Sequence, residues 1–530
     1  MQNKDPAKIW QEYEKGLAFN QSLELYETVK KNENFFIGKQ WEGLNAPDLE
    51  KPVLNFLKRV ITYFLSMLVS DDVGISIQSF LQSPDSEVQD KLLSREVERI
   101  IERTKAKTLN RDALRNAAVD GDACFYLRFD PDVETGQFAK GQIAIDVVDN
   151  TNILFGNPYV AEVQEQPYLI IVKRSKLDLV REEAKEAGVQ NWETIHADNE
   201  SQYYGEDRGV DNDLVTVLIK LWKDKKSQTV HFVKCTQDVI LKEPTDLGYR
   251  LYPVAWLSWE KVKNCFHGQA AITQGVIQNQ IYVNTLWALF MIHQKKMAFP
   301  KVFYDNTKID RWTNQVGAAI GVVGNPSEAI AGGFRGPDFS QQAMDLVEKT
   351  IQYTKEFMGA GDAALGNVKP DNTSAIIAVQ KASSAPLELQ RLAFYQFVED
   401  YVRIMVDIIR ARYGLRKVMI NDEEGTEQYA LVDFNSLPYD AMEINVEVGS
   451  SAYWSELMQI QTADNLFNKH IITDAITYLE TIPDRYIRNK GKILEQLRQM
   501  QENQLIQQGL QGLPNQAALP QVNSFQSVIS

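Results

Sequence analysis

The chain has 530 residues, of which 44% are hydrophobic and 24% charged. These proportions are close to those of ordinary globular proteins and exclude a mostly disordered chain, a collagen-like chain and a small disulfide-stapled protein. Asp and Glu outnumber Lys and Arg by 71 to 56, which gives a formal net charge of −15. Such an acidic chain is poorly suited to bind nucleic acid across a broad surface, because phosphate neutralisation needs clustered Lys and Arg. Weak contact with DNA at a few points remains compatible with it.

Cysteine and histidine give no sign of a disulfide framework or a metal site. The three cysteines are far apart in sequence, so we expect them to stay reduced. The five histidines have no metal-ligand spacing near a cysteine, and we predict no metal and no cofactor. The N-terminus lacks the apolar core of a signal peptide. The longest apolar stretches, residues 60–69 and 286–292, are shorter than the roughly 20 residues that span a bilayer, so we predict no membrane association.

Residues 1–250 mix helical and strand-like patterns, which predicts an α+β domain. Ile143, Ile145 and Val147 alternate with polar or small residues, as in a half-buried strand. Further strands are expected at Tyr168–Lys173, Val215–Trp222 and Thr229–Lys234, and helices at Leu23–Ile37, Pro52–Val69, Asp90–Asp120 and Lys176–Gly188.

A helical hairpin with a small insert is predicted next. Residues 251–266 are expected to connect the first domain to a helix over 267–297, roughly 45 Å long. The apolar face of this helix is predicted to hold Ile277, Ile281, Ala288 and Ile292. Asn284 lies on the same face and would need a hydrogen-bonding partner there. The turn-rich residues 298–337 contain short strand-like pieces at Val302–Tyr304 and Ala319–Val323, and a second helix is expected over 338–358.

The rest of the chain is predicted to be mainly helical. Residues 359–372 form a glycine-rich loop, and 373–413 a long helix kinked at Pro386. Beyond the kink, one apolar stripe is predicted from residues spaced 4, 3, 4 and 3 apart: Phe394, Val398, Tyr401, Met405 and Ile408. Residues 414–450 contain two strand-like runs, Gln428–Phe434 and Met442–Val448. Residues 451–508 are expected to form helices, and the Gln- and Ser-rich tail 509–530 is predicted to be disordered.

The usual enzyme signatures are absent from the sequence. No G-x-x-x-x-G-K-[ST] occurs, and Gly361–Gly366 is followed by Asn367 and Val368 where a phosphate-binding lysine would stand. No H-E-x-x-H, C-x-x-C or G-x-S-x-G is present. We therefore expect no enzymatic activity.

The predicted hairpin has little core of its own. Helices of this kind are stabilised mainly by burying an apolar face against neighbours. We therefore expect the hairpin to pack against other copies of the chain, with the insert exposed at its tip.

This layout resembles the portal proteins of tailed bacteriophages, over about residues 20–500. The phrases that carry the resemblance, in chain order, are Asn34–Trp41 (NFFIGKQW) with Pro52–Asn55, Ala117–Ala123 (AAVDGDA), Val147–Pro158 (VVDNTNILFGNP), Pro386–Arg391 (PLELQR), Ile444–Trp454 (INVEVGSSAYW) and Tyr478–Asp484 (YLETIPD).

The resemblance implies a dodecameric ring around a DNA channel at one vertex of the capsid, assembled in the host cytoplasm and carried in the virion. Residues 1–250 would be the wing, 267–297 and 338–358 the stem helices, 298–337 the clip and 359–372 the tunnel loop. Residues 373–413 would be the long kinked helix, 414–450 a strand-rich return to the wing, and 451–508 the crown. The implied partners are double-stranded DNA, terminase, a head–tail adaptor, and the capsid and scaffolding proteins.

Several side chains could meet DNA or partner proteins in such a ring, although each has an ordinary structural alternative. In the tunnel loop, one Lys369 from each subunit would form a ring of positive charge. Alternatively, Lys369 is an ordinary solvated lysine. The glycines would let the loop move or end a helix, and the asparagines would contact DNA or cap the next helix. The stem lysines would face DNA or capsid, or offset the charge of a helix C-terminus. Clip residues would anchor a partner or pack inside the clip. These candidates are Gly359, Gly361, Gly366, Asn367, Lys369 and Asn372; Lys295, Lys296 and Lys301; and Lys308, Arg311 and Trp312.

Two other classes of protein stay open at this point. A DNA-processing enzyme of the packaging machinery would need a phosphate loop or a carboxylate metal cluster, neither of which the sequence displays. A capsid or adaptor protein of another shape would form a shell or a smaller ring.

Overall fold

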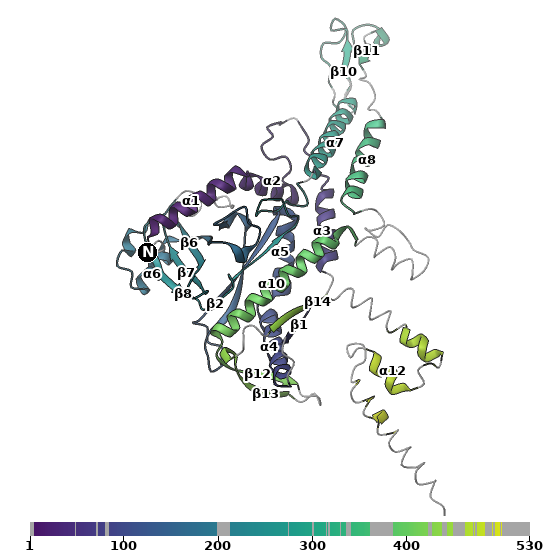
Figure 1. Cartoon of the computed structure of the whole chain (residues 1–530). Helices are drawn as coiled ribbons and strands as arrows, with labels where there is room; N and C mark the ends of the chain where they lie inside the picture. Colours follow the sequence, from purple (N-terminus) through teal and green to yellow (C-terminus); the bar gives the residue numbers. More distant parts are fainter. Residues whose placement is uncertain are drawn as a thin grey trace, which may run out of the picture. The chain divides into compact units, whose positions relative to one another are not determined.

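The computed structural model divides the chain into two compact units, Met1–Glu447 and Val448–Ser530. It has the predicted mixture of helices and sheets, and its elements are labelled in Figure 1. The described residues of the first unit are 5–47, 49–69, 73–79, 84–198, 213–273, 275–298, 301–313, 315, 319–328, 330–334, 341–360, 385–421, 427–436 and 442–447. Those of the second unit are 448, 460, 462–469, 471, 474–482, 490, 493–494, 496–498 and 500.

A three-stranded antiparallel sheet lies at the centre of the first unit. Strand β2 (Asp122–Asp130) pairs with β3 (Gln142–Val148) on one side and β9 (Val254–Ser258) on the other. Helix α10 (Glu388–Arg412) covers one face, where the Phe125 ring lies 4.8 Å from Phe397 and 5.7 Å from Tyr401. The predicted stripe of α10 is buried as expected; its residues are Phe394, Val398, Tyr401, Met405 and Ile408.

A five-stranded antiparallel sheet, in the order β4-β5-β6-β7-β8, lies between two helices. Leu218 and its neighbours pack under α1 (Pro6–Ser22), whereas Val215 and Val217 on the opposite face pack under α6 (Leu177–Glu186). Successive side chains of a strand point to opposite faces, so one strand serves both cores. The strands are β4 (Ile153–Phe155), β5 (Leu169–Lys176), β6 (Leu214–Lys223), β7 (Val230–Cys235) and β8 (Ile240–Asp246).

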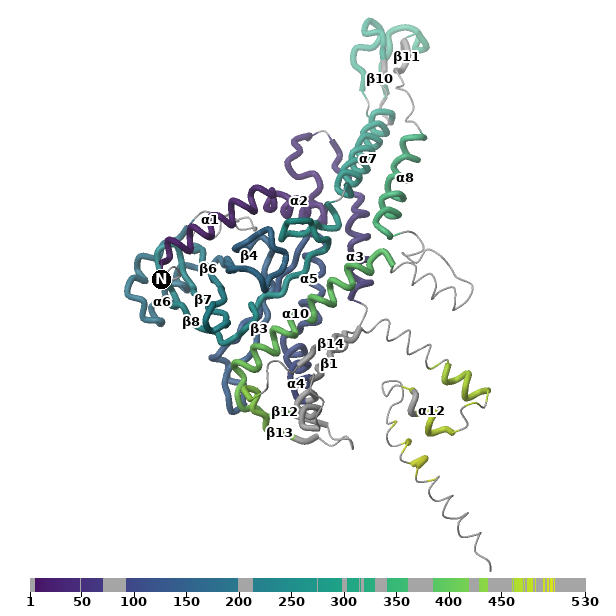
Figure 2. The backbone as a smooth tube through the Cα atoms, viewed as in Figure 1, coloured from purple at the N-terminus to yellow at the C-terminus, as the bar shows by residue number. Residues whose placement is uncertain are grey.

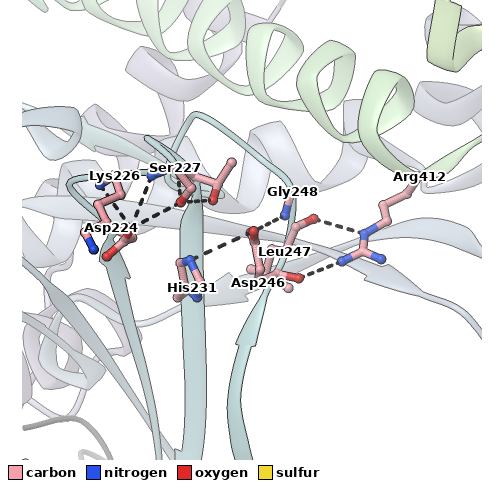
Figure 3. Close-up of polar contacts among 9 residues, drawn as sticks. Asp224, Lys226, Ser227, His231, Asp246, Leu247, Gly248 and Arg412 are labelled. Atoms are coloured by element: carbon pink, nitrogen blue, oxygen red, sulfur yellow. Dashed lines mark hydrogen bonds and ion pairs between the residues drawn. The ribbon is translucent and has the colours of Figure 1, made fainter. Parts of the chain in front are cut away.

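The last turn of α10 is tied to the end of β8. Arg412 donates hydrogen bonds to the carbonyls of Asp246 and Leu247, each 3.0 Å long (Figure 3). His231 on β7 lies 3.9 Å from the Asp246 carboxylate. The same helix therefore covers the three-stranded sheet and holds the five-stranded one.

The first helices agree in part with the predictions. Helix α2 (Leu25–Ile37) ends at Gly38, and α3 (Phe56–Val69) occupies most of its predicted range. The prediction of one helix over Asp90–Asp120 is wrong: α4 (Pro84–Arg103) and α5 (Ala106–Asp120) are separated by Lys105, whose φ is +53°. No Gly or Pro stands at this break, and the charged helical pattern continues across it. The sequence pattern therefore predicted one helix in place of two.

The first helix of the hairpin is shorter than predicted. Helix α7 spans Val276–Ala298, whereas 267–273 is held in a non-helical turn. His267 is buried against Asp122, and the Gly268 N–H donates to the same carboxylate at 2.9 Å. These contacts outweigh the helical tendency of the segment. The prediction of a simple connector over 251–266 is also wrong, because that range contains β9 of the central sheet.

The insert and second hairpin helix follow the predicted order. Strand β10 (Lys301–Tyr304) pairs with β11 (Ile330–Phe334), which was not predicted, whereas the expected strand at Ala319–Val323 is absent. Helix α8 spans Gln341–Phe357. Since β10 follows the end of α7 and β11 precedes α8, the β10–β11 module stands at one end of the hairpin (Figure 1).

The long helix also begins later than expected. A short 3₁₀ turn, Ala385–Leu387, leads into α10 at Glu388, so Pro386 lies in the turn before the helix. The predicted portion 373–384 lies outside the described residues. After α10, β12 (Leu415–Asn421) pairs with β13 (Glu427–Asp433), and β14 (Met442–Val448) pairs with β1 (Val73–Ser79).

In the second unit, residues 460 and 462–468 are helical, and α12 (Ala475–Thr481) begins at Asp474, which caps it. The Phe467 and Tyr478 rings lie 4.6 Å apart. These residues agree with the helices predicted over 451–508, and the tail 509–530 lies outside the described residues.

Candidate functional site

The base of the α7–α8 hairpin is fixed to the body by a buried amide network centred on Asn284. Asn284 is 2% exposed. Its carbonyl oxygen accepts hydrogen bonds from the Leu54 N–H (3.2 Å) and Gln280 Nε2 (3.0 Å), and its Nδ2 donates to Gln40 Oε1 (2.6 Å). The partner that the sequence required for Asn284 is therefore present. A buried polar group without a hydrogen-bond partner lowers the stability of the folded chain. The network therefore fixes α7 to the loop before α3.

Apolar contacts join both hairpin helices to α3. Phe56, Val283 and Val347 form one buried cluster, one residue from each of α3, α7 and α8. Asn279 also donates to Thr354 Oγ1 at 2.9 Å across the hairpin. Figure 2 shows the two helices running side by side.

The outer side of α8 carries an unpaired apolar stripe. Leu346, Tyr353 and Phe357 are spaced 7 and 4 residues apart, which places them on one face of the helix. They are 46%, 52% and 88% exposed, respectively. This face lies about 90° around the helix from Val347 and Thr354, which pack on α7.

Helix α7 also exposes apolar side chains. Ile281 was predicted to lie on the buried face, but it is exposed, because that face is centred on Gln280, Val283 and Asn284. Tyr282 and Leu289 are exposed as well. The hairpin therefore presents apolar surface on both helices, which we call the hairpin stripe: Ile281, Tyr282 and Leu289 on α7 and Leu346, Tyr353 and Phe357 on α8.

The lysines predicted at the end of the first hairpin helix are on its surface. Lys295 and Lys296 lie in the last turn of α7, where positive charge offsets the partial negative charge of the helix end. Lys295 also lies 3.4 Å from the Glu50 carboxylate. Lys301 begins β10, and its side chain lies outside the described set. The positions of Lys295 and Lys296 fit the structural alternative.

The predicted docking residues of the insert are split between its surface and its interior. Trp312 stacks on Tyr304, with ring centroids 5.8 Å apart and an interplanar angle of 26°. Lys308 pairs with Glu328 at 3.4 Å. Arg311 is exposed. Trp312 therefore helps to hold the module together, which leaves Arg311 as the more accessible candidate.

Of the candidate residues in the predicted tunnel loop, only Gly359 lies within the described part of the chain. Gly359 follows α8 with φ +75°, and a Cβ on it would lie 2.5 Å from Pro386 Cβ. Glycine is needed there for both its backbone conformation and its closeness to the start of α10. The other candidates, Gly361, Gly366, Asn367, Lys369 and Asn372, lie outside the described residues.

A buried Ser–Asp–His group in the body has the residue types of a hydrolase triad in a different order. Ser258 Oγ donates to Asp122 Oδ1 at 2.6 Å, and His267 Nδ1 lies 3.2 Å from Asp122 Oδ2. The other imidazole nitrogen is 3.2 Å from Asn20 Oδ1. A nucleophilic serine needs the histidine beside it as base, whereas here the aspartate stands between them. The group joins α1, β2 and the turn after β9.

Burial also shifts the ionisation of a carboxyl near this group. Desolvation raises the pKa of Asp120 to about 8, and the charges of Glu33, Asp149 and Asp122 act in the same direction. Arg115 acts in the opposite direction. Among the described residues, no group of three or more His, Cys, Asp or Glu side chains is arranged to hold a metal ion.

The comparisons with known proteins found no matching family model and no matching curated protein. Within the described parts of the chain, no helix combines the length and apolar character needed to cross a membrane. The hairpin stripe is the main functional clue in the described part of the chain, whereas the sequence indicates only that the hairpin needs a neighbour. The 7- and 4-residue spacing of Leu346, Tyr353 and Phe357 was the signal that could have located it on α8.

Proposed function

We propose that this chain is a ring-forming portal subunit of a tailed bacteriophage, through which the genome enters and leaves the capsid. The observation that carries the proposal is the hairpin stripe. A hairpin fixed to a body at its base, with apolar residues on its outer faces, is incomplete as a single copy. Packing the stripe of one hairpin against the next hairpin buries it in every copy if the copies close into a ring.

In this role, the hairpins form the stem of the ring and surround the channel. The β10–β11 module at their end is the docking surface for terminase and then for a head–tail adaptor, with Arg311 accessible on it. The overall charge of −15 suits a channel through which DNA slides, because dense basic groups would bind the phosphates strongly. The resemblance of the sequence to phage portal proteins implies twelve copies in the ring. The ring would then lie at one capsid vertex of the virion.

The stripe can be tested with a matched pair of variants on α8. Tyr353→Lys places a charge on the stripe, whereas Gln352→Lys makes the same charge change one residue earlier, on a different face of the helix. We expect wild-type protein and Gln352→Lys to form rings of equal mass, and Tyr353→Lys to assemble at least tenfold less well. Sedimentation and negative-stain microscopy report both results.

Equal assembly of all three proteins would remove the stripe from the subunit contact. A wild-type chain that stays monomeric at every concentration and salt tested would contradict the proposed function itself.

A further inference from the structure

A long groove lies between α10 and the outer edge of β9. Its volume is about 880 Å³, and its lining includes Val254–Ser258 of β9, the loops 161–164 and 261–266, and one side of α10 between Ala393 and Arg410. This part of α10 is about 26 Å long. An extended peptide of about eight residues has the same length.

The β9 backbone shows which of its groups face the groove. The Leu127 N–H donates to the Pro253 carbonyl, and the Trp259 N–H donates to the Gly121 carbonyl. The odd-numbered residues of β9 are therefore bonded to β2. Because hydrogen-bonding direction alternates along an antiparallel strand, the even-numbered residues direct their N–H and C=O groups away from β2.

The outward groups are satisfied at both ends of β9 and open between them. Gln164 bonds both outward groups of Tyr252, accepting from its N–H at 2.8 Å and donating to its carbonyl at 3.1 Å. The Gln269 N–H donates to the Glu260 carbonyl at 2.8 Å. For Val254, Trp256 and Ser258, no hydrogen bond of the outward backbone groups is found within the described residues.

A buried carboxylate oxygen on the α10 side of the groove is also unpaired. Asp407 is 2% exposed, and its Oδ2 accepts from the Arg250 and Leu251 N–H groups at 2.7 and 2.8 Å. Its Oδ1 has no hydrogen-bond partner in the described parts of the chain. Unpaired polar groups of this kind are costly when buried, so the groove has the features of a site completed by another segment.

The position of the groove on α10 indicates what fills it. Leu389 lies 7 and 11 residues before Gln396 and Asp400, which line the groove, so all three share one face of the helix. Leu389 is 75% exposed. It stands in the first turn of α10, three residues after Pro386, and Pro386 lies against Gly359 at the end of α8. The α10 face that leads to the groove therefore begins next to the end of α8, the helix end that carries Phe357 of the hairpin stripe.

We propose that this groove receives an extended segment of the neighbouring copy of the chain, which adds a strand to the edge of β9. The inference rests on the proposed ring, since it assigns a second subunit contact beside the stem. Added strands bind through main-chain hydrogen bonds, and covering an open edge also prevents unwanted strand pairing. In the ring, the neighbour supplies the partners of Val254, Trp256 and Ser258.

Hydrogen exchange with single-residue resolution tests this on rings made from the purified chain alone, with the Tyr353→Lys protomer as the unassembled reference. We expect the Trp256 and Ser258 amides to exchange at least tenfold more slowly in the ring. The amides of Ala255 and Leu257 are bonded to β2 and that of Trp259 to Gly121 in both states, so they serve as internal controls with unchanged rates.

Rings in which Trp256 and Ser258 exchange as fast as in the protomer would overturn the inference and leave the proposed function standing. Protection that appears only after another protein is added would also overturn it, because the occupant would then not be a second copy. Failure of the wild-type chain to form any ring would contradict the proposed function instead.

A groove-filling variant gives an independent test. Ala393→Trp places a large side chain in the groove, whereas Leu179→Trp changes an exposed residue of α6 that does not line it. We expect Ala393→Trp to raise the protein concentration needed for assembly at least tenfold and Leu179→Trp to leave it unchanged. Normal assembly of Ala393→Trp, with normal protection of Trp256, would contradict an occupied groove.

Discussion

The central three-stranded sheet and the α7–α8 hairpin bury their apolar residues in different ways. In the sheet, Phe125 is completely buried and α10 supplies its neighbours from the same chain. In the hairpin, Val347 is buried against α3 and α7, while Phe357, ten residues later on the same helix and nearer the body, is 88% exposed. The body is thus complete in one copy, whereas the hairpin has one finished face and one unfinished face. This difference indicates where a second copy should bind.

The body should be the most sensitive region to loss of a side chain. Phe125→Ala removes a completely buried ring between β2 and α10, and we expect the free energy of unfolding to fall by about 3–5 kcal/mol. Urea unfolding followed by circular dichroism measures this. Phe138→Ala is the matched control, since Phe138 is 66% exposed. Equal effects of the two substitutions would contradict the packing described for the sheet.

The base of the hairpin should be the next most sensitive region. Asn284→Ala leaves the Leu54 N–H and the amides of Gln280 and Gln40 without their shared partner, so we expect a loss of about 1–3 kcal/mol. Gln294→Ala, at an exposed position further along α7, should change little. Urea unfolding of both variants checks this prediction. A neutral Asn284→Ala would mean that the amide network does not hold the hairpin.

The raised pKa of Asp120 predicts that the free energy of unfolding of the body depends on pH. The pKa of this carboxyl is raised to about 8 in the folded chain from an ordinary value of 3.8, so unfolding releases its proton between these pH values. The stability that it contributes is complete below about pH 4 and is lost as the pH rises through 8. Asp120→Asn should therefore become more stable relative to wild type as pH rises, by at most about 1.4 kcal/mol per pH unit.

Urea midpoints at pH 5, 6, 7 and 8 measure this difference. Asp407, whose pKa is also raised by burial, is present in both proteins and cancels in the comparison. A difference that stays constant across this range would show that Asp120 is ionised in the folded chain.

The hairpin stripe should show the smallest effect on the single copy. Tyr353→Ala removes a half-exposed ring, and we expect the free energy of unfolding of the protomer to change by no more than about 0.5 kcal/mol. The same substitution should still weaken ring assembly, as measured by sedimentation at several concentrations. A large loss of protomer stability would show that Tyr353 packs within a single copy, as Phe125 does, and would contradict its assignment to the contact between copies.

The sequence was informative where the apolar periodicity was strong or where a polar residue lay on an apolar helix face. The stripe of α10 and the need of Asn284 for a partner followed from spacing alone, and both are present. The start of α7 was misplaced because His267 and Gly268 bond to Asp122, 145 and 146 residues earlier in the chain. No local pattern reports a contact of that range. Strand β9 was missed for a similar reason, since its pairing with β2 also joins distant segments.

Of the candidate site, the sequence indicated the hairpin but not its outer face. Trp312 has the chemistry of a docking residue, yet it stacks on Tyr304 inside the β10–β11 module. Residue type alone does not distinguish a surface anchor from a core residue. The groove along β9 could not be predicted either, because it depends on which backbone groups of Val254–Ser258 point away from β2.

Electron microscopy of the purified wild-type chain tests the central claim most directly. The account predicts closed rings with a central hole, in which the hairpins of adjacent copies contact each other through Leu346, Tyr353 and Phe357. Particles that contain one compact copy, or assemblies in which the hairpins point apart with these three side chains in water, would contradict it.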